Sequence, residues 1–281
     1  MTQAWQRLSD RDQGPPAQVL YEGVPGHLEA PLRGWISRTA QSSDLAERVA
    51  LRLGITAGPQ ATWFETAKFL ARSSPSNELL DIVDAILACG GPWEGQFRGG
   101  HRGELETILS EGSSVWRIND DFSGLTRRVD ATSADAATEA RRAASALPTA
   151  GSAAAQLTEA WNAVHRLHPD PPAAYRDAIR AVESAAHAII EPNNRSATLG
   201  TMLGQLRDHP QLYALAIPGP DGTGSIAPLI GMMELLWRGQ TSRHGAQTTT
   251  RSETFEEARM AVGLAVTLVQ WFTAGAVRRV P

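Results

Sequence analysis

Apolar side chains recur every three or four residues along most of the chain, which is the pattern of amphipathic helices. One stripe of this kind lies in segment 77–88 and consists of Leu79, Leu80, Val83, Ile86 and Leu87. Another lies in segment 174–190 and consists of Tyr175, Ile179, Val182, Ala186 and Ile189. The pattern predicts a mainly α-helical protein.

One stretch departs from the helical pattern. Segments 115–118 and 125–129 are short and rich in β-branched or apolar residues, and the residues between them, 119–124, read Asn-Asp-Asp-Phe-Ser-Gly. Turn-forming residues between two such segments are typical of a β-hairpin. We therefore expect a small hairpin near 115–129 inside an otherwise helical N-terminal domain.

An alanine-rich helical segment, 135–147, is followed by Pro148-Thr149-Ala150-Gly151. Proline and glycine close together mark a connection between elements. The sequence thus predicts two domains, residues 1–147 and 148–281, of which the second is an up-and-down helical bundle. A helix ending near residue 167 in that bundle carries His165 and His168 close to Asp170, and helix-terminal contacts are the simpler interpretation of these residues than a metal site.

The last helix of the bundle has two apolar stripes. One contains Phe255, Ala258, Val262, Ala265, Val269 and Phe272, and the other contains Met260, Leu264, Leu268 and Trp271. A helix that is apolar on two sides must be covered on two sides. We expect one stripe to pack inside the bundle and the other to contact a second copy of the chain, which predicts a homodimer.

Composition and charge limit the cellular compartment and the kinds of binding partner to be expected. Net charge is −4, so any contact with RNA must be local. Cys89 is the single cysteine, which leaves neither a disulfide framework nor a thiolate metal site. The polar, charged N-terminus does not resemble a signal peptide, and segment 260–277 carries too many Gly, Thr and Gln residues for a membrane anchor. We expect a cytoplasmic protein without membrane contact.

The candidate chemistry lies between the last two apolar segments. Arg238, Arg243 and His244 occur there within seven positions. An imidazole can take a proton from a ribose 2′-hydroxyl near neutral pH, and a guanidinium can stabilise the charge that develops on phosphate oxygens. The alternative interpretation is structural: Arg238 follows Glu234 at the spacing of a surface ion pair, and Arg243 and His244 are solvated loop residues.

These residues also carry a resemblance. Arg238 and His244, with five residues between them, fit the Arg-x(4–6)-His pattern of HEPN domains, and Arg243-His244-Gly245 resembles the abortive-infection branch of that superfamily. HEPN nucleases usually have Asn, Asp or His after the motif arginine. Gly239 stands at that position here, so Arg238 and Arg243 both remain candidates for the motif arginine.

The resemblance extends to other segments. Residues 175–186, Tyr-Arg-Asp-Ala-Ile-Arg-Ala-Val-Glu-Ser-Ala-Ala, resemble the second helix of abortive-infection HEPN modules, where an acidic residue faces the motif. Glu183 is accordingly a candidate to orient Arg238, Arg243 or His244, with a solvent-facing glutamate as the alternative. The N-terminal half resembles the AbiJ-type domain that precedes such modules, through Pro-Leu-Arg-Gly-Trp-Ile at 31–36 and Leu-Leu-Asp-Ile-Val-Asp at 79–84.

The resemblance implies a metal-independent endoribonuclease of a bacterial abortive-infection or toxin-type anti-phage system, without a cofactor. In this hypothesis His244 is the general base or a phosphate-binding imidazolium, and Arg243, with or without Arg238, stabilises the phosphorane. The implied partners are single-stranded RNA, a second copy that completes a composite cleft, and an antitoxin or another defence protein. The alternative function is a catalytically inactive HEPN-like module for dimerisation or sensing that regulates a partner protein.

Overall fold

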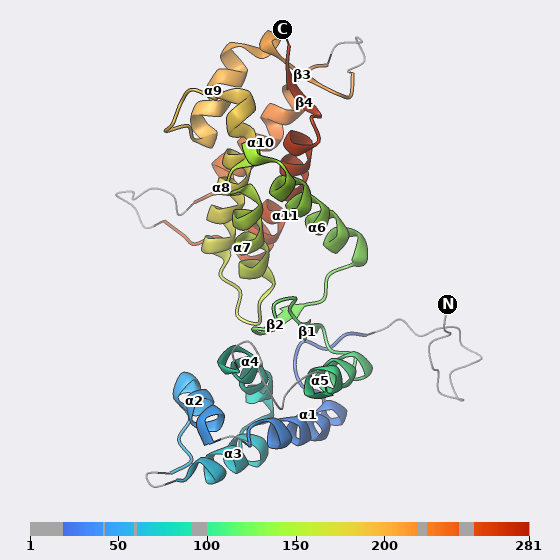
Figure 1. The fold of residues 1–281 in the computed structure, drawn as a ribbon, viewed down its shortest axis with the longest axis vertical. Coiled ribbons are helices and arrows are strands. Elements are labelled where there is room, and N and C mark those ends of the chain that lie inside the picture. Colours follow the sequence, from blue (N-terminus) through green and yellow to red (C-terminus); the bar gives the residue numbers. More distant parts are fainter. Residues whose placement is uncertain are drawn as a thin grey trace, which may run out of the picture. The chain divides into compact units, whose positions relative to one another are not determined.

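The structure is a computed structural model that describes residues 19–41, 43–58, 61–90, 100–218, 224–241 and 250–280. The chain divides into two compact units, residues 1–128 and 129–281. Helices dominate both units (Figure 1), and this confirms the predicted mainly α-helical fold.

The N-terminal unit is built from five helices and one hairpin within its described residues. Its elements are α1 (Gly26–Thr39), α2 (Ser43–Leu53), α3 (Trp63–Arg72), α4 (Leu79–Cys89), α5 (Gly100–Glu111), β1 (Trp116–Ile118) and β2 (Leu125–Arg127), with a 3-10 turn at Ser76–Glu78. Helix α1 packs against α3, α4 and α5, and α2 packs against α3 and α4. Trp35 of α1 is fully buried, and its indole N–H donates to the carbonyl of His101 at 2.7 Å.

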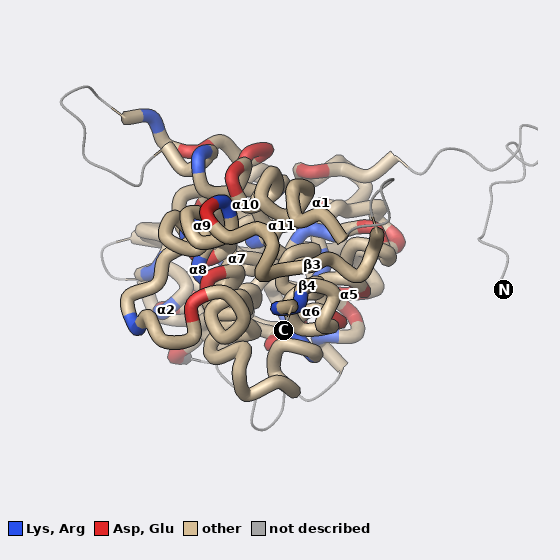
Figure 2. The backbone as a smooth tube through the Cα atoms, turned by 90° about the horizontal axis from the view of Figure 1, so that it is seen from above, with Lys and Arg blue, Asp and Glu red and all other residues tan. Residues whose placement is uncertain are grey.

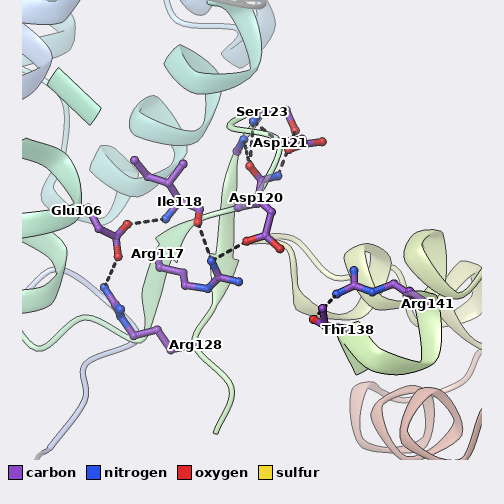
Figure 3. A network of polar contacts seen from close by, with 11 residues as sticks. Glu106, Arg117, Ile118, Asp120, Asp121, Ser123, Arg128, Thr138 and Arg141 are labelled. Carbon is purple, nitrogen blue, oxygen red and sulfur yellow. Dashed lines mark hydrogen bonds and ion pairs between the residues drawn. The ribbon is translucent and has the colours of Figure 1, made fainter. Parts of the chain in front are cut away.

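The predicted hairpin is confirmed. Strands β1 and β2 are antiparallel, with Trp116 opposite Arg127 and Ile118 opposite Leu125. Each strand also donates one backbone N–H to a carboxylate from a helix: Ile118 to Glu106 at 3.0 Å, and Leu125 to Asp84 at 2.6 Å. The other oxygen of Glu106 accepts from Arg128 at 2.9 Å (Figure 3). The hairpin is thereby attached to α4 and α5.

The C-terminal unit is a helical bundle with a second small sheet. Its elements are α6 (Ala131–Ala146), α7 (Ala153–His165), α8 (Pro171–Ile190), α9 (Leu199–Asp208), β3 (Tyr213–Leu215), α10 (Ala227–Gly239), α11 (Phe255–Thr273) and β4 (Val277–Arg279), with 3-10 turns at Pro148–Ala150 and Pro210–Leu212. Helices α7, α8 and α11 pack against one another, and α10 packs against α9 and α11.

Helix α6 belongs to this bundle. Its buried face consists of Ala137, Ala140 and Ala144, which are part of the same core cluster as α7, α8 and α11. The Gln270 side chain of α11 also donates to the carbonyl of Ala136 at 3.0 Å. The two units therefore divide after Arg128, ahead of α6, whereas the sequence analysis placed the division after residue 147.

Helix α11 is more completely covered than its two apolar stripes suggested. Helices α6, α7, α8 and α10 all contact it. From the second stripe, Leu268 is fully buried and Leu264 and Trp271 pack against the core, while Met260 is 71% exposed. The expectation that this stripe as a whole is left for a second copy was wrong, because three of its four side chains are buried in the bundle core or packed against it. The homodimer itself stays a prediction.

The sheet formed by β3 and β4 was not expected from the sequence. The two strands are antiparallel, with Tyr213 opposite Arg279 and Leu215 opposite Val277. The pairing joins residues more than sixty positions apart, so no local turn signal predicts it.

Among the described residues, no helix has the length and apolar content needed to span a membrane.

Candidate functional site

Arg238 lies in the last turn of α10, which ends at Gly239 before the extended residue Gln240. Its side chain is 73% exposed, and its guanidinium is 3.8 Å from the Glu234 carboxylate, one turn earlier. The same Glu234 oxygen pairs with Arg207 of α9. Two guanidinium groups thus share one carboxylate.

A shallow hollow of about 440 Å³ lies beside Arg238. It is lined by Gly231, Glu234, Leu235, Arg238 and Gly239, all from the solvent-facing side of α10. Leu235 is 65% exposed, so an apolar surface and a cation lie next to each other. This combination suits a ligand that carries both a flat apolar group and a negative charge.

Gly239 is in close contact with Tyr175 of α8. A Cβ atom placed on Gly239 would lie 2.2 Å from the Tyr175 hydroxyl oxygen, which is far closer than van der Waals contact. The Asn, Asp or His that HEPN nucleases usually carry after the motif arginine would need this space. Glycine at this position therefore has a steric reason in this fold.

Tyr175 stays neutral in this environment. Its side chain is almost fully buried. Burial and the nearby negative charges of Glu253 and Glu257 raise the pKa of Tyr175 to about 12. The phenol is consequently protonated at any physiological pH.

The described residues on either side of segment 242–249 are hydrogen-bonded to each other. The Thr241 hydroxyl lies 2.9 Å from the carbonyl oxygen of Arg251 and 3.4 Å from a carboxylate oxygen of Glu253. Glu253 is only 4% exposed. Arg243 and His244, the two residues at the centre of the predicted site, lie outside the described residues.

Arg251 is fixed in turn by the start of α11. Its guanidinium donates to both carboxylate oxygens of Glu257, at 2.7 and 2.6 Å. Glu257 also accepts the Thr254 backbone N–H at 2.8 Å, and the Thr254 hydroxyl accepts the Glu257 N–H, which together form a capping box. The Arg251 hydrogen bonds, followed by the Thr254 N–H, lower the pKa of Glu257 to about 2.

Glu183 has a defined structural partner. Its carboxylate accepts the backbone N–H of Leu199, the first residue of α9, at 2.7 Å. This N–H belongs to the first turn of a helix, where it has no partner within the helix itself. Glu183 thus joins α8 to the start of α9 instead of pointing only to solvent. Its expected contact with Arg243 or His244 stays a prediction.

The residues near the end of α7 have structural contacts as well. His165 is buried, with Nδ1 2.9 Å from the carbonyl oxygen of Trp161. Its ring is tilted by 41° against the Trp161 indole, with the ring centroids 4.2 Å apart. Asp170 caps α8 by accepting the Ala173 N–H at 3.1 Å. Among the residues that the structure describes, His, Cys, Asp and Glu side chains form no group of three suited to a metal ion.

The sequence analysis did not foresee the role of Tyr175, Thr241 or Arg251. Tyr175 appeared only as a member of an apolar stripe, because helical spacing shows burial but not the identity of the neighbour across the bundle. The one local signal was Thr254 with Glu257 three residues later, the pattern of a capped helix start.

Comparisons of the chain with protein-family models, with curated proteins and with solved structures found no match. The resemblance to HEPN domains therefore depends on the sequence motifs quoted above.

Proposed function

We propose that the protein is a metal-independent endoribonuclease that acts as the effector of an abortive-infection or toxin-type anti-phage system. The observation that carries the proposal is the position of Arg238. Its exposed guanidinium ends α10 directly before the segment with Arg243 and His244, and the residues that flank this segment are anchored to each other through Thr241 and Arg251. A cation is thus exposed to solvent three residues before the last described residue that precedes Arg243 and His244.

The proposed chemistry follows from these residue types. His244 takes the proton of a ribose 2′-hydroxyl, and the resulting 2′-oxygen attacks the adjacent phosphorus and displaces the 5′-oxygen. Arg243, with or without Arg238, stabilises the charge on the phosphorane. Glu183 orients one of these groups. The leaving 5′-oxygen takes up a proton from the imidazolium of His244 or from water. The products are a 2′,3′-cyclic phosphate and a 5′-hydroxyl end.

Charge distribution favours a local contact with unpaired RNA. Lys and Arg positions are interspersed with Asp and Glu positions along the helices (Figure 2), and the whole chain is acidic. Long duplexes are held mainly by many phosphate contacts, which this surface does not favour. A single-stranded segment offers unstacked bases that Leu235 and the neighbouring hollow can contact while Arg238 meets a phosphate.

The first test compares the wild type with His244→Ala on bulk RNA in the presence of EDTA. We expect cleavage by the wild type, cyclic phosphate ends, and a loss of activity on the order of 100-fold or more in the variant, since a general base contributes about that much. His209→Ala is the matched control, because His209 is an exposed histidine of the same unit. Equal cleavage by wild type and His244→Ala, or cleavage only after metal is added, contradicts the proposal.

A second comparison identifies the motif arginine. Arg238→Gln and Arg243→Gln are assayed beside Arg259→Gln, a matched control at an exposed position of α11. We expect substitution of the motif arginine to lower kcat by about 10- to 1,000-fold, because this arginine stabilises the transition state. An activity loss from Arg259→Gln of the same size would show that general charge, and not this site, supports cleavage.

A non-enzymatic module for dimerisation or sensing is the second candidate. It is favoured by the exposed apolar side chains Leu235 and Met260 on α10 and α11. If this candidate is right, His244→Ala keeps defence or toxicity in cells, whereas Met260→Glu abolishes it. The reverse pattern supports the nuclease.

A further inference from the structure

Tyr175 and Gly239 form a contact between α8 and the end of α10 that only glycine permits. Gly239 has no left-handed backbone angle, so its conformation alone does not require glycine. The requirement comes from the Tyr175 hydroxyl, which occupies the position where a side chain would begin, at 2.2 Å. The next atom of the phenol ring, Cζ, would lie 3.3 Å from that Cβ.

The tyrosine in this contact cannot easily move away. Its ring is buried among the core residues of the bundle. On the chain beyond Gly239, Thr241 is held by Arg251, and Arg251 is held by Glu257 of α11. The end of α10 is therefore fixed from α8 on one side and from α11 on the other.

Arg238 directly precedes Gly239 and shares its helical turn. A shift of Gly239 away from Tyr175 would move the Cα of Arg238 and hence the origin of its guanidinium. Displacements of about 1 Å at a site that stabilises a transition state lower rates by up to about 100-fold.

We infer that Tyr175 is a positioning residue for the site: through its contact with Gly239 it sets the place of Arg238 and of the chain that leaves α10. This inference depends on the proposed nuclease function. It adds a residue of α8 that touches no substrate and acts through the backbone of α10.

The test is a double-mutant cycle with Gly239→Ala, Tyr175→Phe and the double variant. Gly231→Ala is the matched control, because Gly231 lies in the same helix and a Cβ there meets no atom within 4 Å. We measure thermal unfolding, the folded fraction by circular dichroism, and kcat and KM for RNA cleavage without metal.

We expect Gly239→Ala to lower the melting temperature and to reduce kcat by about tenfold or more while the protein stays folded. Gly231→Ala should stay close to the wild type. Tyr175→Phe should lower kcat with little change in KM, because the hydroxyl no longer sets the place of Gly239, and wild-type kcat in Tyr175→Phe overturns the positioning role. In the double variant the hydroxyl is gone, so both the melting temperature and kcat should return toward the values of Tyr175→Phe.

Two failures are distinguishable. A wild type that cleaves no RNA removes the proposed function and this role with it. If the wild type is active, two further results overturn the positioning role alone. In the first, Gly239→Ala behaves like Gly231→Ala. In the second, the double variant regains the melting temperature of Tyr175→Phe but not its kcat.

Discussion

The carboxylate of Glu257 accepts several hydrogen bonds at the start of α11. It accepts two hydrogen bonds from Arg251 and closes the capping box with Thr254 at the start of α11. These bonds favour the ionised form, and the pKa of Glu257 falls from its usual 4.5 to about 2. In the unfolded chain the carboxyl loses these partners, so folding and protonation are linked.

The linkage predicts an acid-dependent loss of stability. Because the pKa of Glu257 is lower in the folded state, its stabilising effect is complete above about pH 4.5 and is lost as the pH falls toward 2. Glu257→Gln should therefore flatten the decrease of melting temperature across this range. The neighbouring Glu256→Gln is the control, and an unchanged pH profile for Glu257→Gln would refute the linkage.

Single residues also mark the limit of prediction from sequence. The motif spacing identified Arg238 as a candidate, and its ion pair with Glu234 was foreseen from the four-residue separation. Gly239 looked like a departure from a family pattern, but its cause is Tyr175, more than sixty positions earlier. Such a contact depends on how α8 and α10 are placed in three dimensions, which no local pattern encodes.

At the scale of elements, local signals predicted helices well. Helix α3 begins after Thr62, whose side chain and Glu65 form a capping box, and α4 coincides with its apolar stripe. The sequence also predicted helix α6, but it placed this helix in the N-terminal domain, whereas α6 belongs to the C-terminal unit. Alanine is only weakly hydrophobic, so the buried face of α6 hardly differs from its exposed face in the sequence. The sequence pattern therefore does not show which core the helix joins.

The small side chains of α6 predict a sharp response to added volume. Ala140→Leu should destabilise the protein by about 1–3 kcal/mol, because the larger side chain overpacks a fully buried position against the bundle. Ala146→Leu, at an exposed position of the same helix, should change stability little. Chemical denaturation measures both, and equal effects would show that α6 does not pack as described.

At the scale of the whole molecule, the division after Arg128 makes a prediction about fragments. Residues 129–281 contain every helix that the described C-terminal core includes, whereas residues 148–281 lack α6. The first fragment should unfold cooperatively on its own, and the second should lose cooperativity because the α6-facing side of α11 is exposed. Circular dichroism during heating distinguishes them; equal cooperativity would place α6 outside the folding unit.

The long-range parts of the fold were the ones that sequence did not predict. A short turn joins β1 and β2, and the residues of this turn predicted the hairpin. The pairing of β3 with β4 closes a separation that contains α10 and α11, so it depends on the finished bundle. For the same reason the sequence predicted a second copy against a stripe of α11 that the helices of the bundle already cover in large part.

The carboxylates of Glu106 in α5 and Asp84 in α4, which accept hydrogen bonds from the β1–β2 hairpin, bear on association between copies of the protein. Backbone donors on an uncovered ribbon invite strands from other molecules, which is how ordered aggregates begin. At Ile118 and Leu125 those donors are already occupied by oxygen atoms from α5 and α4. At these two positions the hairpin offers no free N–H to a strand from another copy of the protein.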